Sequence, residues 1–182
     1  ASMLNLAESG QLKALADPFL LNPAGTAPAD LAPHADPPGA QHDADFDAWL
    51  APFVMAAINS RVVRRSAALA GPGGAYAAGF VYQEYLRTGR GALAAAAATG
   101  MAGGLGLGLL GLRLAPYRSA LRALLPAPGK GPSEQAMDGG SFRCDLIGQS
   151  ASGHRVRGRI AGQGDPGNRA TTIFVCESAL AL

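Results

Sequence analysis

The sequence has little charge and few aromatic side chains. Only 15% of its 182 residues are charged and 6% are aromatic, whereas 48% are hydrophobic. The apolar content is therefore mostly alanine, leucine and valine. Because burial stabilises a fold in proportion to its apolar area, an alanine-rich chain gains little free energy per residue. We expect one domain over residues 1–182 with a modest core, or a core completed by a partner surface.

Cysteine is also scarce. Cys144 and Cys176 are far apart in the sequence and form no CxxC pair. This spacing argues against a structural zinc site and against a disulfide framework, so we expect both thiols to be buried as small apolar groups. The histidines and aspartates between positions 34 and 45 match no known ligand spacing either. We therefore expect no metal site.

No strong excess of charge of either sign is present. The formal net charge is +2, and the arginines fall in local groups instead of one basic stripe. We therefore expect no nucleic-acid partner. The chain starts at Ala1 in what reads as a helix and stops at Leu182 within an apolar stripe, without a terminating cap. We expect it to be a piece of a longer protein.

Hydrophobic periodicity, interrupted by glycine and proline, predicts an α+β fold. The proline-rich stretch 22–45 predicts an irregular surface loop. Expected helices cover 1–16, 52–70 and 169–182, and expected strands cover 76–85, 141–149 and 154–161, with a hairpin turn at 150–153. We expect a mostly antiparallel sheet covered by the helices at 52–70 and 169–182. The residues expected to face the core are Val54, Ile58, Val62 and Leu69 of the helix at 52–70, and Val156 and Ile160 of the last strand.

An uncharged run lies between Arg90 and Arg113 and is long enough to cross a bilayer, which takes about 20 residues. Glycines at 100, 104 and 108 permit close helix approach. We expect 91–125 to protrude as an apolar Ala/Gly-rich helical element that dips into one leaflet as a hairpin, because its glycines can break the helix. The alternatives are a helix that spans the bilayer, and a buried helix or glycine-rich hairpin of a soluble core. The expected lipid contacts are Leu105, Leu107, Leu109, Leu110, Arg113, Arg118 and Arg122.

The same run contains a formal GxGxxG pattern at 106–111. A dinucleotide-binding fingerprint follows a strand, opens a helix and is followed by an acidic residue about 20 positions later. Here the pattern sits inside an apolar run. We therefore expect no NAD(P) to bind to this chain by itself.

Several separated motifs occur in order along the chain: Pro52–Ala56 with Val62–Ser66, a Gly-Pro-Ser-Glu turn at 131–134, and Gly164–Gly167 followed by Glu177–Leu180. Together they resemble the motifs of the saccharopine dehydrogenase-like oxidoreductases, a family that includes the trans-acting enoyl reductases of glycolipid assembly. The resemblance implies that this chain is the carboxyl-terminal half, without the Rossmann domain. It implies NAD(P) in the full-length protein, the missing Rossmann half as a partner, and work on lipid substrates.

Polar side chains of the helix at 52–70 are the candidate contacts for substrate or cofactor. They are Asn59, Arg61, Arg64 and Arg65. The planar guanidinium suits phosphate or carboxylate groups. The alternative is a solvated helix face with salt bridges. No catalytic residue is assigned, since hydride transfer needs mainly positioning from the protein.

Two functions remain open. The first is the substrate half of a NAD(P)-dependent, enoyl reductase-like enzyme of lipid or glycolipid biosynthesis, at the cytoplasmic side of a membrane as a peripheral or monotopic protein. The second is a non-enzymatic membrane-associated or oligomerisation module of the same fold. A second copy of the chain is a further candidate partner.

Overall fold

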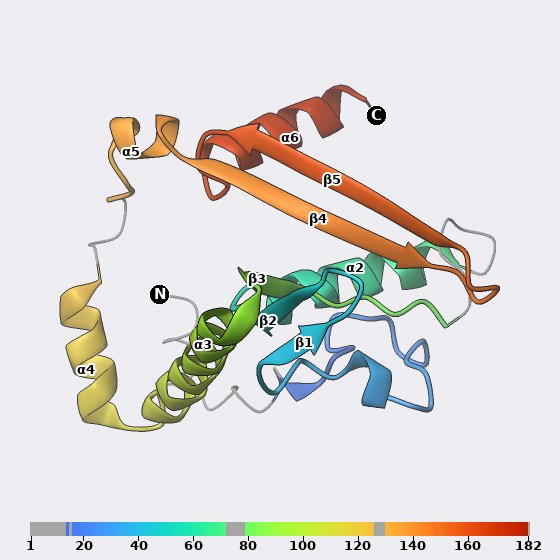
Figure 1. Cartoon of the computed structure of the whole chain (residues 1–182), viewed down its shortest axis with the longest axis horizontal. Coiled ribbons are helices and arrows are strands. Elements are labelled where there is room, and N and C mark those ends of the chain that lie inside the picture. Colours follow the sequence, from blue (N-terminus) through green and yellow to red (C-terminus); the bar gives the residue numbers. More distant parts are fainter. Residues whose placement is uncertain (1–13, 15, 72–78, 126–129, 182) are drawn as a thin grey trace. The chain divides into compact units, whose positions relative to one another are not determined.

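The computed structural model describes residues 14, 16–71, 79–125 and 130–181. The helix predicted at 1–16 therefore lies almost wholly outside the described residues. The chain divides into two compact units, Ala1–Leu124 and Leu125–Leu182. Both contain helices and antiparallel strands (Figure 1), so the α+β prediction is confirmed.

The first unit contains a three-stranded antiparallel sheet in the order β1-β2-β3. The strands are β1 (Gln41–Asp43), β2 (Ala48–Pro52) and β3 (Tyr85–Gly89). The turn between β1 and β2 is held by the Asp43 carboxylate, which accepts from the backbone N–H groups of Asp45 and Phe46 at 2.9 Å each. The irregular loop expected over 22–45 therefore contains strand β1 near its end, which the proline-rich composition did not predict.

The strand predicted at 76–85 is wrong in position. β3 begins at Tyr85, residues 79–84 have no regular structure, and 72–78 lie outside the described residues. The alternation of Phe80, Tyr82 and Glu84 does not reflect a ladder. The carbonyl of Tyr82 accepts instead from a helix side chain, Arg64.

The helix predicted from Pro52 begins four residues later, as α2 (Ala56–Ala70). Pro52 ends β2, where it pairs with Tyr85, and proline is tolerated at such a strand end. The predicted buried stripe is also wrong. Val54, Ile58, Val62 and Leu69 are all exposed, whereas Ala56, Ser60, Arg61 and Arg64 form the buried face. The inward face of α2 is thus largely polar.

The uncharged run forms one continuous helix, α3 (Gly91–Gly111), and the predicted hairpin is wrong. Each glycine costs about 1 kcal/mol relative to alanine, but the alanine run in the first half of α3 offsets part of this cost. That half packs on β2 and β3, with Ala94 and Ala98 buried. The Thr88 hydroxyl of β3 lies 3.0 Å from the carbonyls of both Trp49 and Ala94, which ties strand to helix.

A sharp corner joins α3 to the short helix α4 (Ala115–Leu124). The ring of Tyr117 lies so close to Gly111 that an added Cβ would be 2.9 Å from its atoms. Arg118 donates to the carbonyl of Leu112 at 2.9 Å, satisfying a carbonyl at the end of α3. Glycine at 111 is therefore a packing requirement of this corner.

The second unit consists of α5 (Glu134–Asp138), β4 (Ser141–Gln149), β5 (Arg155–Gln163) and α6 (Arg169–Leu180). The strands predicted at 141–149 and 154–161 and the helix predicted at 169–182 are confirmed by β4, β5 and α6. Arg169 joins α6 to α5 through Asp138 at 2.7 Å and Glu134 at 3.1 Å. β4 and β5 form a sheet of their own, so the single sheet expected from the sequence is wrong: β3 pairs with β2 instead.

One face of the hairpin is apolar but largely exposed. Phe174 of α6 packs edge-to-face on Phe142, with ring centroids 5.7 Å apart. Beyond that contact, Val156 and Ile160 are 71% and 51% exposed, so their predicted burial is wrong. Both cysteines are exposed as well, again against expectation. Residue alternation identified the apolar face, but it did not show whether another layer covers that face.

Candidate functional site

The buried face of α2 carries two guanidinium groups. Arg61 is only 2% exposed and binds the Asp36 carboxylate through both terminal nitrogens, at 3.1 and 2.9 Å. Its Nε donates to the carbonyl of Asp17 at 3.0 Å. Bidentate arginine–carboxylate pairs are among the strong hydrogen-bonded pairs of proteins. This pair fixes the proline-rich segment to α2.

Arg64 lies one turn further along the same face and is 3% exposed. It donates to the carbonyls of Pro18 at 3.0 Å and Tyr82 at 3.1 Å, and its guanidinium lies 5.6 Å from the centre of the Phe19 ring. Burial lowers the pKa of Arg64, and neighbouring Arg61 lowers it further, whereas Asp36 opposes the shift. An arginine stays charged under such shifts, so it remains a donor.

These contacts explain why α2 buries arginines and exposes valines. Residues 17–36 form no ladder with a strand in the described structure, so their carbonyls need other donors. Arg61 and Arg64 supply donors to two of them, those of Asp17 and Pro18, and the solvated-face alternative is wrong for these two arginines. Arg65 is exposed and donates to the carbonyl of Leu21. The three arginines therefore hold the chain's own backbone.

A second polar cluster joins the fourth candidate, Asn59, to Glu84. The Asn59 amide donates to Glu84 Oε2 at 2.9 Å, and the Tyr82 hydroxyl donates to Oε1 at 2.7 Å. Sequence reasoning placed Tyr82 and Glu84 on one strand face but did not link them to Asn59. The i, i+2 spacing of a hydroxyl and a carboxylate was the only available signal. The cluster attaches residues 82–84 to α2.

His34 belongs to the segment 17–36 that the arginines of α2 hold, and it is 5% exposed. It ends the short 3-10 helix η2 (Ala32–His34), and its ring packs edge-to-face on Phe19 at 4.8 Å. Burial lowers the pKa of His34, Arg64 lowers it further, and Asp30 opposes the shift. The imidazole is therefore neutral at neutral pH.

The pKa of His34 predicts a pH dependence of stability. A histidine whose folded pKa is lowered binds fewer protons in the native state, so the free energy of unfolding should fall as pH drops below the ordinary value of 6.5. We expect His34→Gln to remove this component, measured by urea unfolding followed through Trp49 fluorescence. His154→Gln, at an exposed position, is the control and should leave the component intact. A pH profile unchanged by His34→Gln would contradict the assignment.

Exposed leucines lie on the second half of α3, at the corner after it and at the end of α4, and we call them the leucine surface: Leu107, Leu109, Leu110, Leu114 and Leu124. Of the four leucines expected to be exposed on α3, three are, and Leu105 is half-buried. Over Gly91–Gly111 the helix is long and apolar enough to cross a bilayer. Only 11% of its most apolar 18-residue stretch is buried. Core helices of soluble proteins pass the same length test but are mostly buried, which α3 is not.

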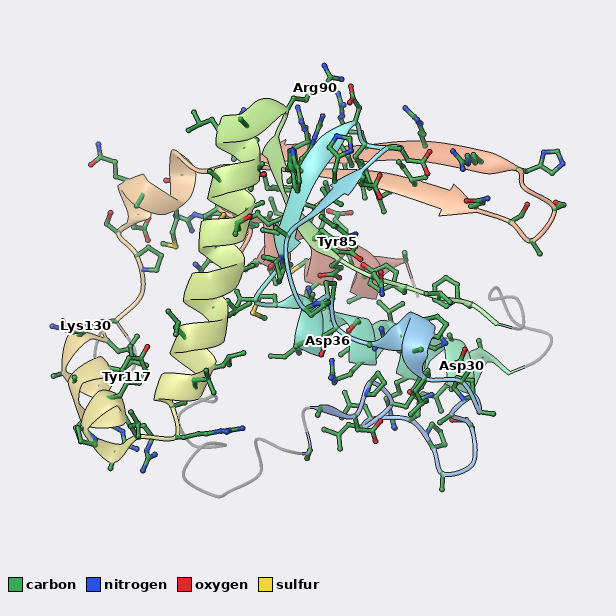
Figure 2. All side chains as sticks on the ribbon, turned by 60° about the horizontal axis from the view of Figure 1, so that its bottom comes forward. Asp30, Asp36, Tyr85, Arg90, Tyr117 and Lys130 are labelled. Carbon is green, nitrogen blue, oxygen red and sulfur yellow. The ribbon has the colours of Figure 1, made fainter. Side chains whose placement is uncertain are left out.

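Charges flank the two ends of α3 differently. At the start of α3, Arg90 forms an ion pair with Asp47 at 2.7 Å. Tyr117 of α4 lies near the opposite end of α3 (Figure 2). The three arginines at that other end are Arg113, Arg118 and Arg122, and α4 itself carries no acidic residue. The leucine surface thus combines exposed apolar area with positive charge.

Metal ligands are not clustered on the buried face of α2 or on the leucine surface, as far as the structure describes them. Among the described residues, no group of three or more His, Cys, Asp or Glu side chains is placed to hold an ion. The GxGxxG pattern at 106–111 lies inside α3, where Tyr117 covers Gly108 and Gly111. The pattern therefore does not open a helix after a strand, as a dinucleotide-binding fingerprint does.

Comparison with known proteins finds relatives of one description. A Mycobacterium tuberculosis protein provisionally named a trans-acting enoyl reductase is 36% identical over 177 residues, which is 92% of this chain and 41% of that protein. The trans-acting enoyl reductase of Mycobacterium ulcerans is 36% identical over 176 residues, 91% of this chain and 41% of its own length. The chain spans about two-fifths of the length of these relatives. No protein-family model matches it, and no solved structure matches it.

Proposed function

We propose, on the premise of this similarity, that the chain is the substrate-side half of a NAD(P)-dependent oxidoreductase of the saccharopine dehydrogenase-like type. Its reaction would be the reduction of a carbon–carbon double bond in a lipid or glycolipid precursor. The observation that carries the proposal is the 36% identity along 92% of the chain to proteins named enoyl reductases. The chain's 41% share of the relative's length is consistent with a further domain.

The nucleotide would be held by that further domain. A bound NAD(P)H would supply the hydride, and the residues of this chain would supply position and surroundings. Two devices support such a role. The Arg61 and Arg64 contacts tie residues 17–36 to α2, and the leucine surface offers exposed apolar area beside positive charge.

The leucine surface is the proposed lipid contact. The first half of α3 is held by β2 and β3, whereas its second half and α4 expose leucines and arginines. A helix with one half packed on protein suits insertion into one leaflet, with arginines among anionic headgroups. The chain would then be a monotopic or peripheral protein, on the cytoplasmic side of the membrane.

Calorimetry with NADPH tests where the cofactor binds. The 182-residue chain should give no binding heat, because its GxGxxG pattern is covered inside a helix. The chain extended by its preceding coding sequence should bind NADPH at micromolar concentration and consume it with an enoyl thioester. Binding to the unextended chain would contradict the cofactor placement. An extended protein that neither binds nor consumes NADPH would favour a non-enzymatic membrane or oligomerisation module.

A further inference from the structure

β4 has an open edge. It pairs with β5 in the register Cys144↔Ile160, and within the part of the chain that the structure describes no other strand joins it. Next to the turn, the Ser150 N–H donates to the His154 carbonyl at 2.9 Å. In an antiparallel ladder this direction alternates, so even-numbered residues of β4 bond to β5. The N–H and C=O groups of the odd-numbered residues face the open edge.

The outer edge of β5 is protected by its charge. Arg155, Arg157 and Arg159 lie on one face at every second position. If two copies paired antiparallel through the middle of β5, arginines would stand opposite arginines. Like charges directly opposite each other destabilise a strand pair, and edge charges are a common protection against such pairing.

β4 has a self-complementary pattern instead. Arg143 and Asp145 lie on the same face, one on each side of Cys144. An antiparallel pair of β4 strands related by a twofold axis at Cys144 would place Arg143 opposite the second copy's Asp145, and the reverse. The same register places Phe142 opposite the second copy's Leu146 on the apolar face. It also pairs odd residues with odd residues, so the outward N–H and C=O groups meet.

We propose that β4 pairs with β4 of a second copy around Cys144, giving a four-stranded antiparallel sheet across a homodimer. Asp145 is 18% exposed and already receives Arg143 at 3.2 Å and Arg159 at 2.6 Å within its own hairpin. The second copy's Arg143 would extend this network, because that side chain is 52% exposed. The dimer therefore adds to the ion pairs of the hairpin without breaking them.

Sheet stability gives the pairing its driving force. An isolated two-stranded hairpin is only marginally stable in water, and a further strand with a shared apolar face strengthens it. Leu146 and Ile160 are 43% and 51% exposed in the hairpin. The dimer would join two such faces into one wider apolar layer.

Oxidative cross-linking tests the register directly. In a Cys176→Ser background, copper-catalysed oxidation should join two copies through Cys144. Opposed residues in a non-hydrogen-bonded antiparallel pair have Cα atoms about 4.5 Å apart, within the range of about 4.4–6.8 Å that disulfides need. Sedimentation velocity on the reduced chain should show a dimer. A monomer at every concentration, or a dimer that does not cross-link, would overturn the proposal.

Charge reversal tests the pairing independently of the thiol. We expect Arg143→Glu to raise the dissociation constant of the dimer about tenfold or more, because two attractive pairs become repulsive. Arg157→Glu, on β5, makes the same charge change and should have no such effect. Asp145→Arg should also weaken self-association.

Mixing the two β4 variants shows whether their weaker association comes from the lost charge pairing or from misfolding. In a heterodimer of Arg143→Glu with Asp145→Arg, both cross-strand positions regain opposite charges. The mixture should therefore dimerise more tightly than either variant alone. Failure to associate in the mixture, with hairpins intact by circular dichroism, would overturn the register. The assay contains neither cofactor nor lipid, so its outcome is independent of the proposed oxidoreductase function.

Discussion

Replacing Arg113 and Arg122 by glutamate will lower the affinity of the chain for anionic vesicles about thirtyfold or more. Each arginine near an anionic surface contributes about 1 kcal/mol, and each added glutamate is repelled, so the loss reaches at least about 2 kcal/mol. Arg118 stays unchanged in this variant because it donates to Leu112 at the corner between α3 and α4. The measurement is flotation with vesicles that contain phosphatidylglycerol.

A matched variant separates the leucine surface from general charge. Arg155→Glu with Arg157→Glu changes the net charge by the same amount but lies on the hairpin, and it should bind vesicles as the unmodified chain does. Vesicles of zwitterionic lipid should distinguish little between the three proteins. Equal loss of binding in both charge variants would mean that net charge alone draws the chain to the membrane.

Asp36→Asn will destabilise the first unit by about 3 kcal/mol. The substitution leaves the buried Arg61 guanidinium without a counter-charge, and breaking a buried ion pair from one side carries a cost of this size. Asp36 itself is 37% exposed, which keeps the expected value at the lower end of the range. Urea unfolding followed by Trp49 fluorescence measures the loss.

The ion pair between Arg90 and Asp47 provides the matched control. It joins the same two residue types at 2.7 Å, but its side chains are 69% and 61% exposed. Asp47→Asn should therefore cost less than about 1 kcal/mol. Asparagine also tolerates the positive φ of 46° at this position. If both substitutions cost the same, burial of Arg61 is not what makes its ion pair important.

A double substitution addresses the role of the buried pair. Arg61→Met with Asp36→Leu removes both charges and leaves apolar side chains, which is often close to neutral for a buried ion pair. The carbonyl of Asp17 would still lose its donor. We expect the double variant to be more stable than Asp36→Asn, but less stable than the unmodified protein.

The second unit was largely predictable because its structure is local. Alternation over 141–149 and 154–161, with the turn at 150–153, predicted β4 and β5 to within two residues at their ends. The periodicity after the turn at 164–168 predicted α6. The uncharged run predicted an apolar helical segment over 91–125, but the break expected at its glycines is wrong, because α3 is continuous over Gly91–Gly111. Neighbouring residues decide these elements, so the sequence carries the information.

Only the tertiary structure decided which face of α2 is buried. Periodicity favoured Val54, Ile58, Val62 and Leu69, yet the buried side chains include Arg61 and Arg64. Those arginines are buried because carbonyls of Asp17, Pro18 and Tyr82 need donors, and these groups are 18 to 46 positions away in the chain. Similarly, β3 pairs with β2 and not with the later hairpin. Hydrogen-bond partners that are distant in sequence leave no local pattern, whereas periodicity records only local order.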